Sequence, residues 1–257
     1  MVKEKEISNK NNEILEYKKL IKKIKSWIYR KVKSTNASGI VLGISGGIDS
    51  ATLSVICHQI FKENAHFYYL KTKKDTENEK DIKELNKILN NSIITINISK
   101  EFDLFSKKFH LSNDWIKANS KSRFFMNVLY TKAQQNNSLV LGTDNFNEYY
   151  LGYFTKWGDG ACDILPFANL FKSDIYKMAK ILKVPQSIMN KKPSANLLDN
   201  QYDEDELGFT YDQFESYFEP KNTLNNEIKA KIEKNFKKTQ HKRKIIPKGP
   251  KKSKKIL

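Results

Sequence analysis

Cysteine is scarce in this chain of 257 residues, which contains only Cys57 and Cys162. The two lie far apart without the spacing of metal ligands, which argues against a disulfide framework or a structural zinc site. They fit a reducing compartment, so we expect a cytoplasmic protein. Long apolar runs are also missing, since no stretch approaches the roughly 20 residues of a membrane-spanning helix. The charged start MVKEKEISNKNNE does not resemble a secretory signal peptide.

Arginine is nearly absent, because Arg30, Arg123 and Arg243 are the only arginines among 46 basic residues. A net charge of +17 often indicates a polyanionic partner such as nucleic acid. However, bidentate recognition of bases and phosphates favours arginine over lysine. The lysines are spread over nearly every segment, so we interpret most of them as solvated surface charges and do not expect a nucleic-acid partner.

Glycines number only ten, yet two adjacent ones mark the most distinctive stretch, residues 43–50 (GISGGIDS). An apolar run precedes this stretch and a helical pattern follows it, which is typical of a buried strand, a tight turn and a helix start. Gly46 and Gly47 allow several backbone N–H groups to converge on a phosphate at the helix N-terminus. Ordinary phosphate loops have a lysine after the second glycine, whereas here Ile48 and Asp49 follow, and a carboxylate could hold Mg²⁺ against a pyrophosphate.

Strand and helix patterns alternate along the chain, which predicts a parallel sheet with right-handed crossovers. The expected strands are residues 39–44, 65–70, 92–98 and 138–142. The expected helices are about 12–33, 81–89, 121–133, 172–182 and 226–238. Ligands gather outside the carboxyl ends of such strands, so Thr143 and Asp144 should lie near the glycine loop. We expect one domain over residues 1–257, with a core at about 39–190, a lid-like loop at about 191–212, and a C-terminal helix with a basic tail at about 224–257.

Several motifs resemble those of a known enzyme family. SGGIDS is similar to the pyrophosphate loop of the N-type ATP pyrophosphatases, which cleave ATP between its α- and β-phosphates. Behind it follow LVLGTDNFNEYYLGYFTKWGDGACDILPFANLFKSDIYKMAKIL, KKPSANL and DEDELGFTYDQF. Together these segments resemble the single-domain, ammonia-dependent NAD synthetases over roughly residues 14–244. The resemblance implies an α/β, Rossmann-like fold with a doubly wound, mostly parallel five-stranded sheet and helices on both faces.

The resemblance also implies roles for individual residues. The ATP-binding set is Gly43, Ile44, Ser45, Gly46, Gly47, Ile48, Asp49, Ser50, Thr143, Lys172 and Ser194. The Mg²⁺ ligands are Asp49 and Glu148, and deamido-NAD would contact Arg123, Lys156, Asp163, His241 and Lys242. Relatives commonly have a second arginine where this chain has Phe125, so a second guanidinium contact is not expected there.

The reaction implied by the resemblance joins ammonia to deamido-NAD through an acyl-adenylate and releases AMP and pyrophosphate. ATP is the co-substrate and Mg²⁺ the cofactor. No covalent intermediate with the enzyme is expected, so no catalytic residue is assigned. The chain has no segment like a glutaminase domain, so ammonia is the expected nitrogen source. Family members are homodimers, and we expect the same here.

Two other functions remain open from the sequence. A tRNA-modifying ATP pyrophosphatase, such as a lysidine synthetase, would account for the high positive charge. A non-enzymatic ATP sensor of similar fold would bind ATP without releasing pyrophosphate, and Glu148 would then be idle. Salt dependence of RNA binding and pyrophosphate release separate these alternatives from the main hypothesis.

Overall fold

A parallel β-sheet forms the centre of the computed structural model, which describes residues 2–72, 75–194, 202–221 and 223–250. The strand order is β3-β2-β1-β4. These strands are β1 (Gly39–Gly43), β2 (Ala65–Lys71), β3 (Ile93–Asn97) and β4 (Ser138–Val140). The chain moves outward in one direction from β1 to β3 and then returns to the other side of β1 with β4. The carboxyl ends of β1 and β4 therefore flank a topological switch point, where ligands bind in open α/β sheets.

Both faces of the sheet are covered by helices, which explains the continuous apolar character of β1. Ile40 and Leu42 belong to one core cluster, while Val41 belongs to the cluster on the opposite face. The first face packs against α1 (Val2–Lys33), α2 (Ile48–Phe61), α3 (Thr76–Ile88), α7 (Lys172–Ile181) and α8 (Gln186–Met189). The second packs against α5 (Asp114–Gln135), with α4 (Ser99–Lys108) behind it. A short 3-10 turn, η1 (Lys62–Asn64), leads into β2.

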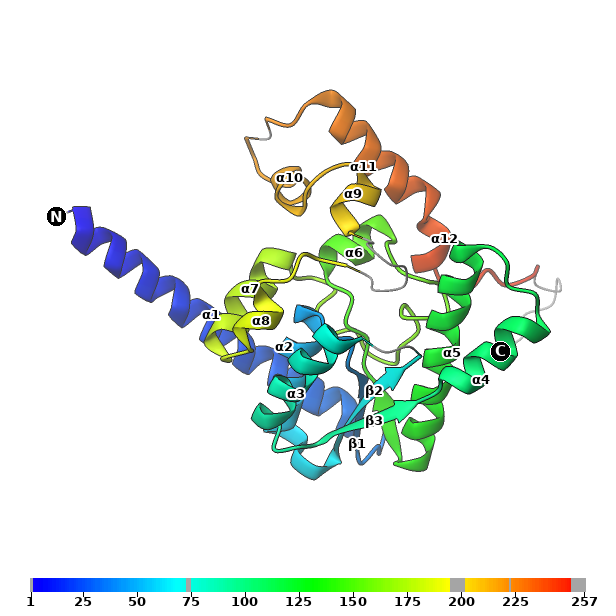
Figure 1. Cartoon of the computed structure of the whole chain (residues 1–257). Helices are drawn as coiled ribbons and strands as arrows, with labels where there is room; N and C mark the ends of the chain where they lie inside the picture. Colours follow the sequence, from blue (N-terminus) through cyan, green and yellow to red (C-terminus); the bar gives the residue numbers. More distant parts are fainter. Residues whose placement is uncertain (1, 73–74, 195–201, 222, 251–257) are drawn as a thin grey trace.

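A third group of short helices has its own apolar cluster. It comprises α6 (Phe146–Leu151), α9 (Asp203–Leu207), α10 (Tyr211–Ser216), α11 (Asn226–Lys238) and α12 (Gln240–Arg243). Leu151, Phe209, Phe214 and Ile232 are buried at its centre. Figure 1 shows these helices together on one side of the sheet, with α6 next to the body of the molecule. The chain thus carries a helical cap over one end of the α/β core.

The predicted fold class is confirmed, but the number of strands is wrong. The described residues form four strands instead of five, and all four are parallel. At the position of a fifth strand there is one parallel bridge, between Leu141 and Ile164. Pro166 follows two residues later and has no N–H to continue a ladder, which explains why the pairing ends there.

Several helices also differ from the sequence-based expectation; for example, α3 begins at Thr76 rather than at 81, and the short helices α6, α8, α9, α10 and α12 were not predicted. α1 begins at Val2 rather than near residue 12, and α4 has no counterpart in the prediction. α5 begins at Asp114, seven residues early, because the Asn113 side chain accepts hydrogen bonds from the N–H groups of Trp115 and Ile116. Trp115 and Ile116 are exposed, so the apolar periodicity does not reveal this first turn. Within the described ranges no helix has the length and apolarity needed to cross a membrane.

Candidate functional site

The glycine loop between β1 and α2 forms the floor of the site. Ser45 Oγ lies 3.1 Å from Ser50 Oγ and accepts a hydrogen bond from the Gly47 N–H at 3.2 Å. Gly47 is the residue before α2 and supplies no side-chain cap, so the first-turn N–H groups of the helix face the cavity. A helix N-terminus without a cap attracts anions through these donors and through its partial positive charge. The loop therefore has the geometry of a phosphate cradle.

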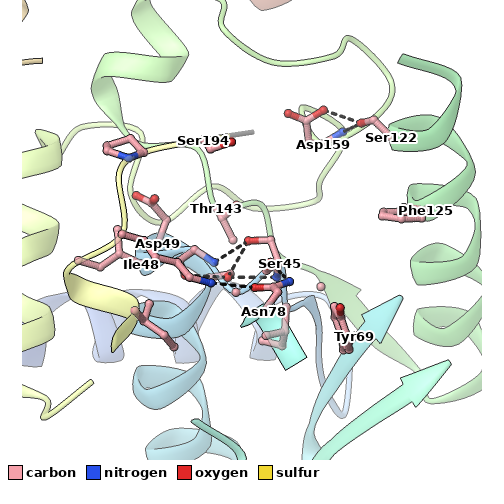
Figure 2. A pocket seen from close by; sticks show the side chains of 18 of the residues that line it. Ser45, Ile48, Asp49, Tyr69, Asn78, Ser122, Phe125, Thr143, Asp159 and Ser194 are labelled. Atoms are coloured by element: carbon pink, nitrogen blue, oxygen red, sulfur yellow. Dashed lines mark hydrogen bonds between the residues drawn. The ribbon is translucent and has the colours of Figure 1, made fainter. Parts of the chain in front are cut away.

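Gly46 makes the turn possible. Its φ of +83° is a conformation that favours glycine, and a Cβ at this position would come within 1.7 Å of Asn78 Oδ1, so a larger residue would also displace the Asn78 side chain. Asn78 Nδ2 donates a hydrogen bond to the carbonyl oxygen of Ser45 at 3.0 Å. α3 therefore holds the loop through Asn78, which lies beside Ser45 in Figure 2.

Two carboxylates converge on one lysine above the loop. Lys172 Nζ lies 2.5 Å from Asp49 Oδ2 and 3.2 Å from Glu148 Oε1. Asn145 orients both acids, because its Nδ2 donates to Asp49 Oδ1 at 3.0 Å and its N–H donates to Glu148 Oε2 at 3.1 Å. α2, α6 and α7 thus each contribute one charged side chain to a single cluster.

Burial controls the electrostatics of this cluster. It raises the pKa of Glu148 to about 7, an effect that Lys172 opposes and Asp49 reinforces. Burial alone would lower the pKa of Lys172, but the carboxylates of Asp49 and Glu148 outweigh it and raise the pKa above its ordinary value. Lys172 therefore stays charged, and the two acids have oxygens close enough to share a cation.

A cavity of about 720 Å³ extends from the glycine loop along the carboxyl edge of the sheet. Figure 2 shows Asp49 and Ser194 towards one end and Phe125 from α5 towards the other. Thr143 and Ser194, which the resemblance assigns to ATP, line the cavity, and so does Phe125; their role in binding ATP stays a prediction. At the far end Ser122 Oγ donates to Asp159 Oδ1 at 2.6 Å, which ties α5 to the loop after α6. The lid-like loop is described only in part, because residues 195–201 lie outside the described residues.

The five residues predicted for deamido-NAD lie outside the lining of this cavity. Three of them form a chain: Arg123 Nε donates to the Lys156 carbonyl at 3.2 Å, and Lys156 Nζ donates to the His241 carbonyl at 2.6 Å. Asp163 instead accepts a hydrogen bond from the N–H of Val140 at 2.7 Å. Their role in binding the dinucleotide stays a prediction.

The segment at 239–243 clamps the loop that begins at Gly152. Lys242 Nζ donates to the carbonyl oxygens of Gly152 at 2.7 Å and Phe154 at 2.6 Å. Arg243 donates to the Tyr149 carbonyl at 3.1 Å, and Thr239 Oγ1 to the Leu151 carbonyl at 3.0 Å. Lys242 is thus engaged with backbone oxygens rather than directed into open solvent.

Sequence reasoning missed Asn78 and Asn145, which orient the loop and the two acids. Asn145 had a recognisable signal, because Asn followed three residues later by Glu148 is a capping-box pattern, and the structure contains that box. Asn78 had no such sequence signal, because it lies in the uniformly polar stretch TENEK.

Comparisons with known proteins point to one enzyme family. The sequence model of the NAD synthase family matches residues 20–246. The NH(3)-dependent NAD(+) synthetase of Finegoldia magna is 40% identical over 232 residues, covering 90% of this chain and 95% of that protein. The solved structure of NMN synthetase from Francisella tularensis aligns with a TM-score of 0.85 at 35% identity, covering 91% of this chain and 98% of the other. For the NH3-dependent NAD synthetase of Campylobacter jejuni, the TM-score is 0.78 and the identity 31%, with 91% and 99% covered.

Proposed function

Because this chain belongs to the NAD synthase family, we propose that it converts deamido-NAD to NAD, using ammonia and ATP and releasing AMP and pyrophosphate. The observation that carries the proposal is the phosphate cradle beside two carboxylates at the switch point of the sheet. This arrangement suits an enzyme that holds a triphosphate and lets pyrophosphate leave. It is a carbon-nitrogen ligase in which the reacting groups belong to the substrates.

The chemistry requires alignment more than a nucleophilic side chain. The carboxylate of deamido-NAD attacks the α-phosphorus of ATP, pyrophosphate leaves, and ammonia then displaces AMP from the acyl-adenylate. Holding the two reactants in position can contribute up to about 7–11 kcal/mol to lowering the barrier. We propose that residues 43–50, with Thr143, Ser194 and Lys172, hold the ATP and offset its negative charge.

Asp49 and Glu148 fit a magnesium ion. Their oxygens approach one lysine nitrogen to 2.5 and 3.2 Å, so a single cation can contact both carboxylates. The described residues contain no group of three or more histidine, cysteine, aspartate or glutamate side chains arranged for a metal. Two carboxylates with phosphate oxygens and water completing the shell is the usual arrangement for Mg²⁺. When bound, Mg²⁺ would neutralise charge on the departing pyrophosphate.

A second candidate substrate is the mononucleotide, nicotinate mononucleotide, whose amidation gives NMN. Two observations favour considering it: the solved NMN synthetase aligns over 91% of this chain, and Phe125 lines the cavity where relatives commonly have an arginine. An aromatic ring cannot pair with the second phosphate group of a dinucleotide. The same adenylation chemistry would apply to either carboxylate.

One assay tests both substrates. The protein is mixed with Mg-ATP, ammonium, and either deamido-NAD or nicotinate mononucleotide, and NAD, NMN, AMP and pyrophosphate are quantified. We expect NAD, AMP and pyrophosphate in equal amounts, and no product when glutamine replaces ammonium. Preferential formation of NMN would assign the second substrate. Release of ADP and phosphate, or pyrophosphate release that depends on tRNA, would reject the proposal.

Arg123 offers a separate test of the dinucleotide site. We propose that Arg123, Lys156, Asp163, His241 and Lys242 contact deamido-NAD. Arg123→Lys should raise the KM for deamido-NAD about tenfold, through loss of a forked charge-assisted hydrogen bond, with little change in the KM for ATP. Arg30→Lys, an exposed change in α1, is the matched control and should alter neither constant. Equal increases in the KM values for deamido-NAD and ATP would show that Arg123 does not contact deamido-NAD.

We further propose a homodimer in the cytoplasm. Large apolar side chains are exposed at the α4–α5 corner, among them Leu104 (69%), Phe109 (62%) and Ile116 (54%), which suits burial against a second copy.

The proposed compartment is supported by the cysteines. Cys57 and Cys162 are both free thiols, which is compatible with a reducing compartment. Light scattering should give about twice the chain mass of 30.0 kDa, and cell fractionation tests the compartment.

A further inference from the structure

Lys191 is a charged side chain at the cavity that none of the assignments above uses. It follows α8, lines the cavity, and its side chain is 25% exposed. Its Nζ forms an ion pair with Asp81 Oδ2 and donates a hydrogen bond to Asn78 Oδ1 at 3.3 Å. Asp81 lies on α3, outside the lining of the cavity, and its side chain is only 6% exposed. A cation at the cavity is thus held by a buried acid behind the cavity wall.

This ion pair lies beside the phosphate cradle. Asn78, which accepts the hydrogen bond from Lys191, donates its own to the Ser45 carbonyl at 3.0 Å, and Figure 2 shows Asn78 and Ser45 side by side. Asn78 Oδ1 also occupies the space that a Cβ on Gly46 would need. Only the Asn78 amide therefore separates Lys191 Nζ from the glycine turn. Because a lysine has a flexible stem and three donors, a rotation of its side chain can bring Nζ to a phosphate in the cradle.

The charge of a triphosphate or a pyrophosphate calls for a further cation at the cradle. Lys172 is already shared by Asp49 and Glu148, which compensate its charge by direct contact. Lys191 is paired with a single acid that lies outside the cavity lining, so its charge can be redirected. We infer that Lys191 moves from Asp81 to a phosphate oxygen when ATP or pyrophosphate occupies the cradle, an assignment that rests on the proposed function.

Asp81 and the phosphate then compete for one ammonium group. Binding of the phosphate gains a charge-assisted hydrogen bond from Lys191. It also leaves the buried carboxylate of Asp81 without its cation, which is costly and opposes the exchange. Asp81 therefore lowers the affinity of the cradle for pyrophosphate. By taking the lysine back, this acid promotes the departure of pyrophosphate after adenylation.

Calorimetric titration with magnesium pyrophosphate tests this competition. Asp81→Asn removes the competing charge with little change in volume, so it should tighten pyrophosphate binding about tenfold. Adding Lys191→Met to Asp81→Asn should weaken binding about tenfold relative to the single variant, through loss of the charge-assisted hydrogen bond. The double variant leaves neither member of the ion pair uncompensated, and its melting temperature verifies that it folds. Lys83→Met, an exposed change of the same charge on α3, is the matched control and should not alter the affinity.

The outcomes separate this inference from the proposed function. If wild type binds neither pyrophosphate nor ATP, the phosphate cradle and with it the proposed function fail. If wild type binds them and Lys191→Met in the Asp81→Asn background leaves the affinity unchanged, Lys191 does not contact the phosphate. If Asp81→Asn weakens binding or leaves it unchanged, the ion pair only supports the glycine loop through Asn78, and the inference is overturned.

Discussion

Glu148→Gln should abolish most NAD formation without destabilising the unliganded protein. Glutamine keeps the side-chain length and can still accept the hydrogen bond from the Asn145 N–H, but it removes a carboxylate proposed to bind Mg²⁺. Loss of a charge-stabilising contact of this kind costs about 10²–10³ in turnover. Initial rates measured at increasing Mg²⁺ should remain low, and near-normal turnover at limiting Mg²⁺ would exclude Glu148 as a ligand.

The stability of the same variant should depend on pH. Burial raises the pKa of Glu148 from 4.5 to about 7, so the folded protein holds this proton more tightly than the unfolded chain does. Between these values the wild-type free energy of unfolding falls as pH rises, because the folded state resists ionisation. Because glutamine does not ionise, Glu148→Gln removes this fall in the free energy of unfolding. The melting temperature of the variant relative to wild type should therefore be higher at pH 8 than at pH 5, and an unchanged difference would contradict the burial of this acid.

Lys172→Met should cause the largest loss of stability. The change leaves Asp49 and Glu148 buried without their cation, and breaking a buried ion pair from one side costs about 3–5 kcal/mol. The start of α7 should survive, since the backbone N–H of Lys172 still donates to Asn147. Urea unfolding measures the loss, and activity should fall with it because the variant also lacks a charge at the proposed ATP site.

Lys177→Met on the same helix is the matched control. Lys177 pairs with Glu13 at 2.6 Å, but both side chains are 47% exposed, so at most about 1 kcal/mol should be lost. Replacing Asp49 by Asn as well as Lys172 by Met should restore part of the stability, because it removes one of the uncompensated charges. Equal effects of the two lysine variants would show that the cluster around Lys172 is not charged in the folded protein.

The phosphate cradle could be predicted from the sequence because its parts are contiguous. Strand, glycines, hydroxyls and helix start all lie within residues 39–61, so local rules of turn and helix geometry were sufficient. The carboxylate cluster could not be predicted from the residues alone. Asp49 and Lys172 are separated by 123 positions, and only the folded chain reveals that Lys172 lies between two acids that would otherwise repel.

The other differences between the predicted and the observed structure have local physical causes. A fifth strand does not form beyond the single bridge at Ile164, because Pro166 follows two residues later and has no N–H to continue the pairing. The exposed side chains of Trp115 and Ile116 obscure the start of α5, because amphipathic periodicity records only the buried face. Asp144 follows a strand, as predicted, but the sequence does not indicate that its Oδ2 atom is buried without a donor among the residues that the structure describes.

The clamp at 239–243 has a consequence for the growing polypeptide on the ribosome. The glycine loop, β4 and α6 are all translated before residue 152, and α7 soon after. The loop that begins at Gly152 can contact α5 as soon as it is made, through Asp159 and Ser122. Its first residues, however, are held at Leu151, Gly152 and Phe154 by side chains translated almost ninety residues later. A nascent chain can therefore assemble its nucleotide cradle well before residues 239–243 close over the start of this loop.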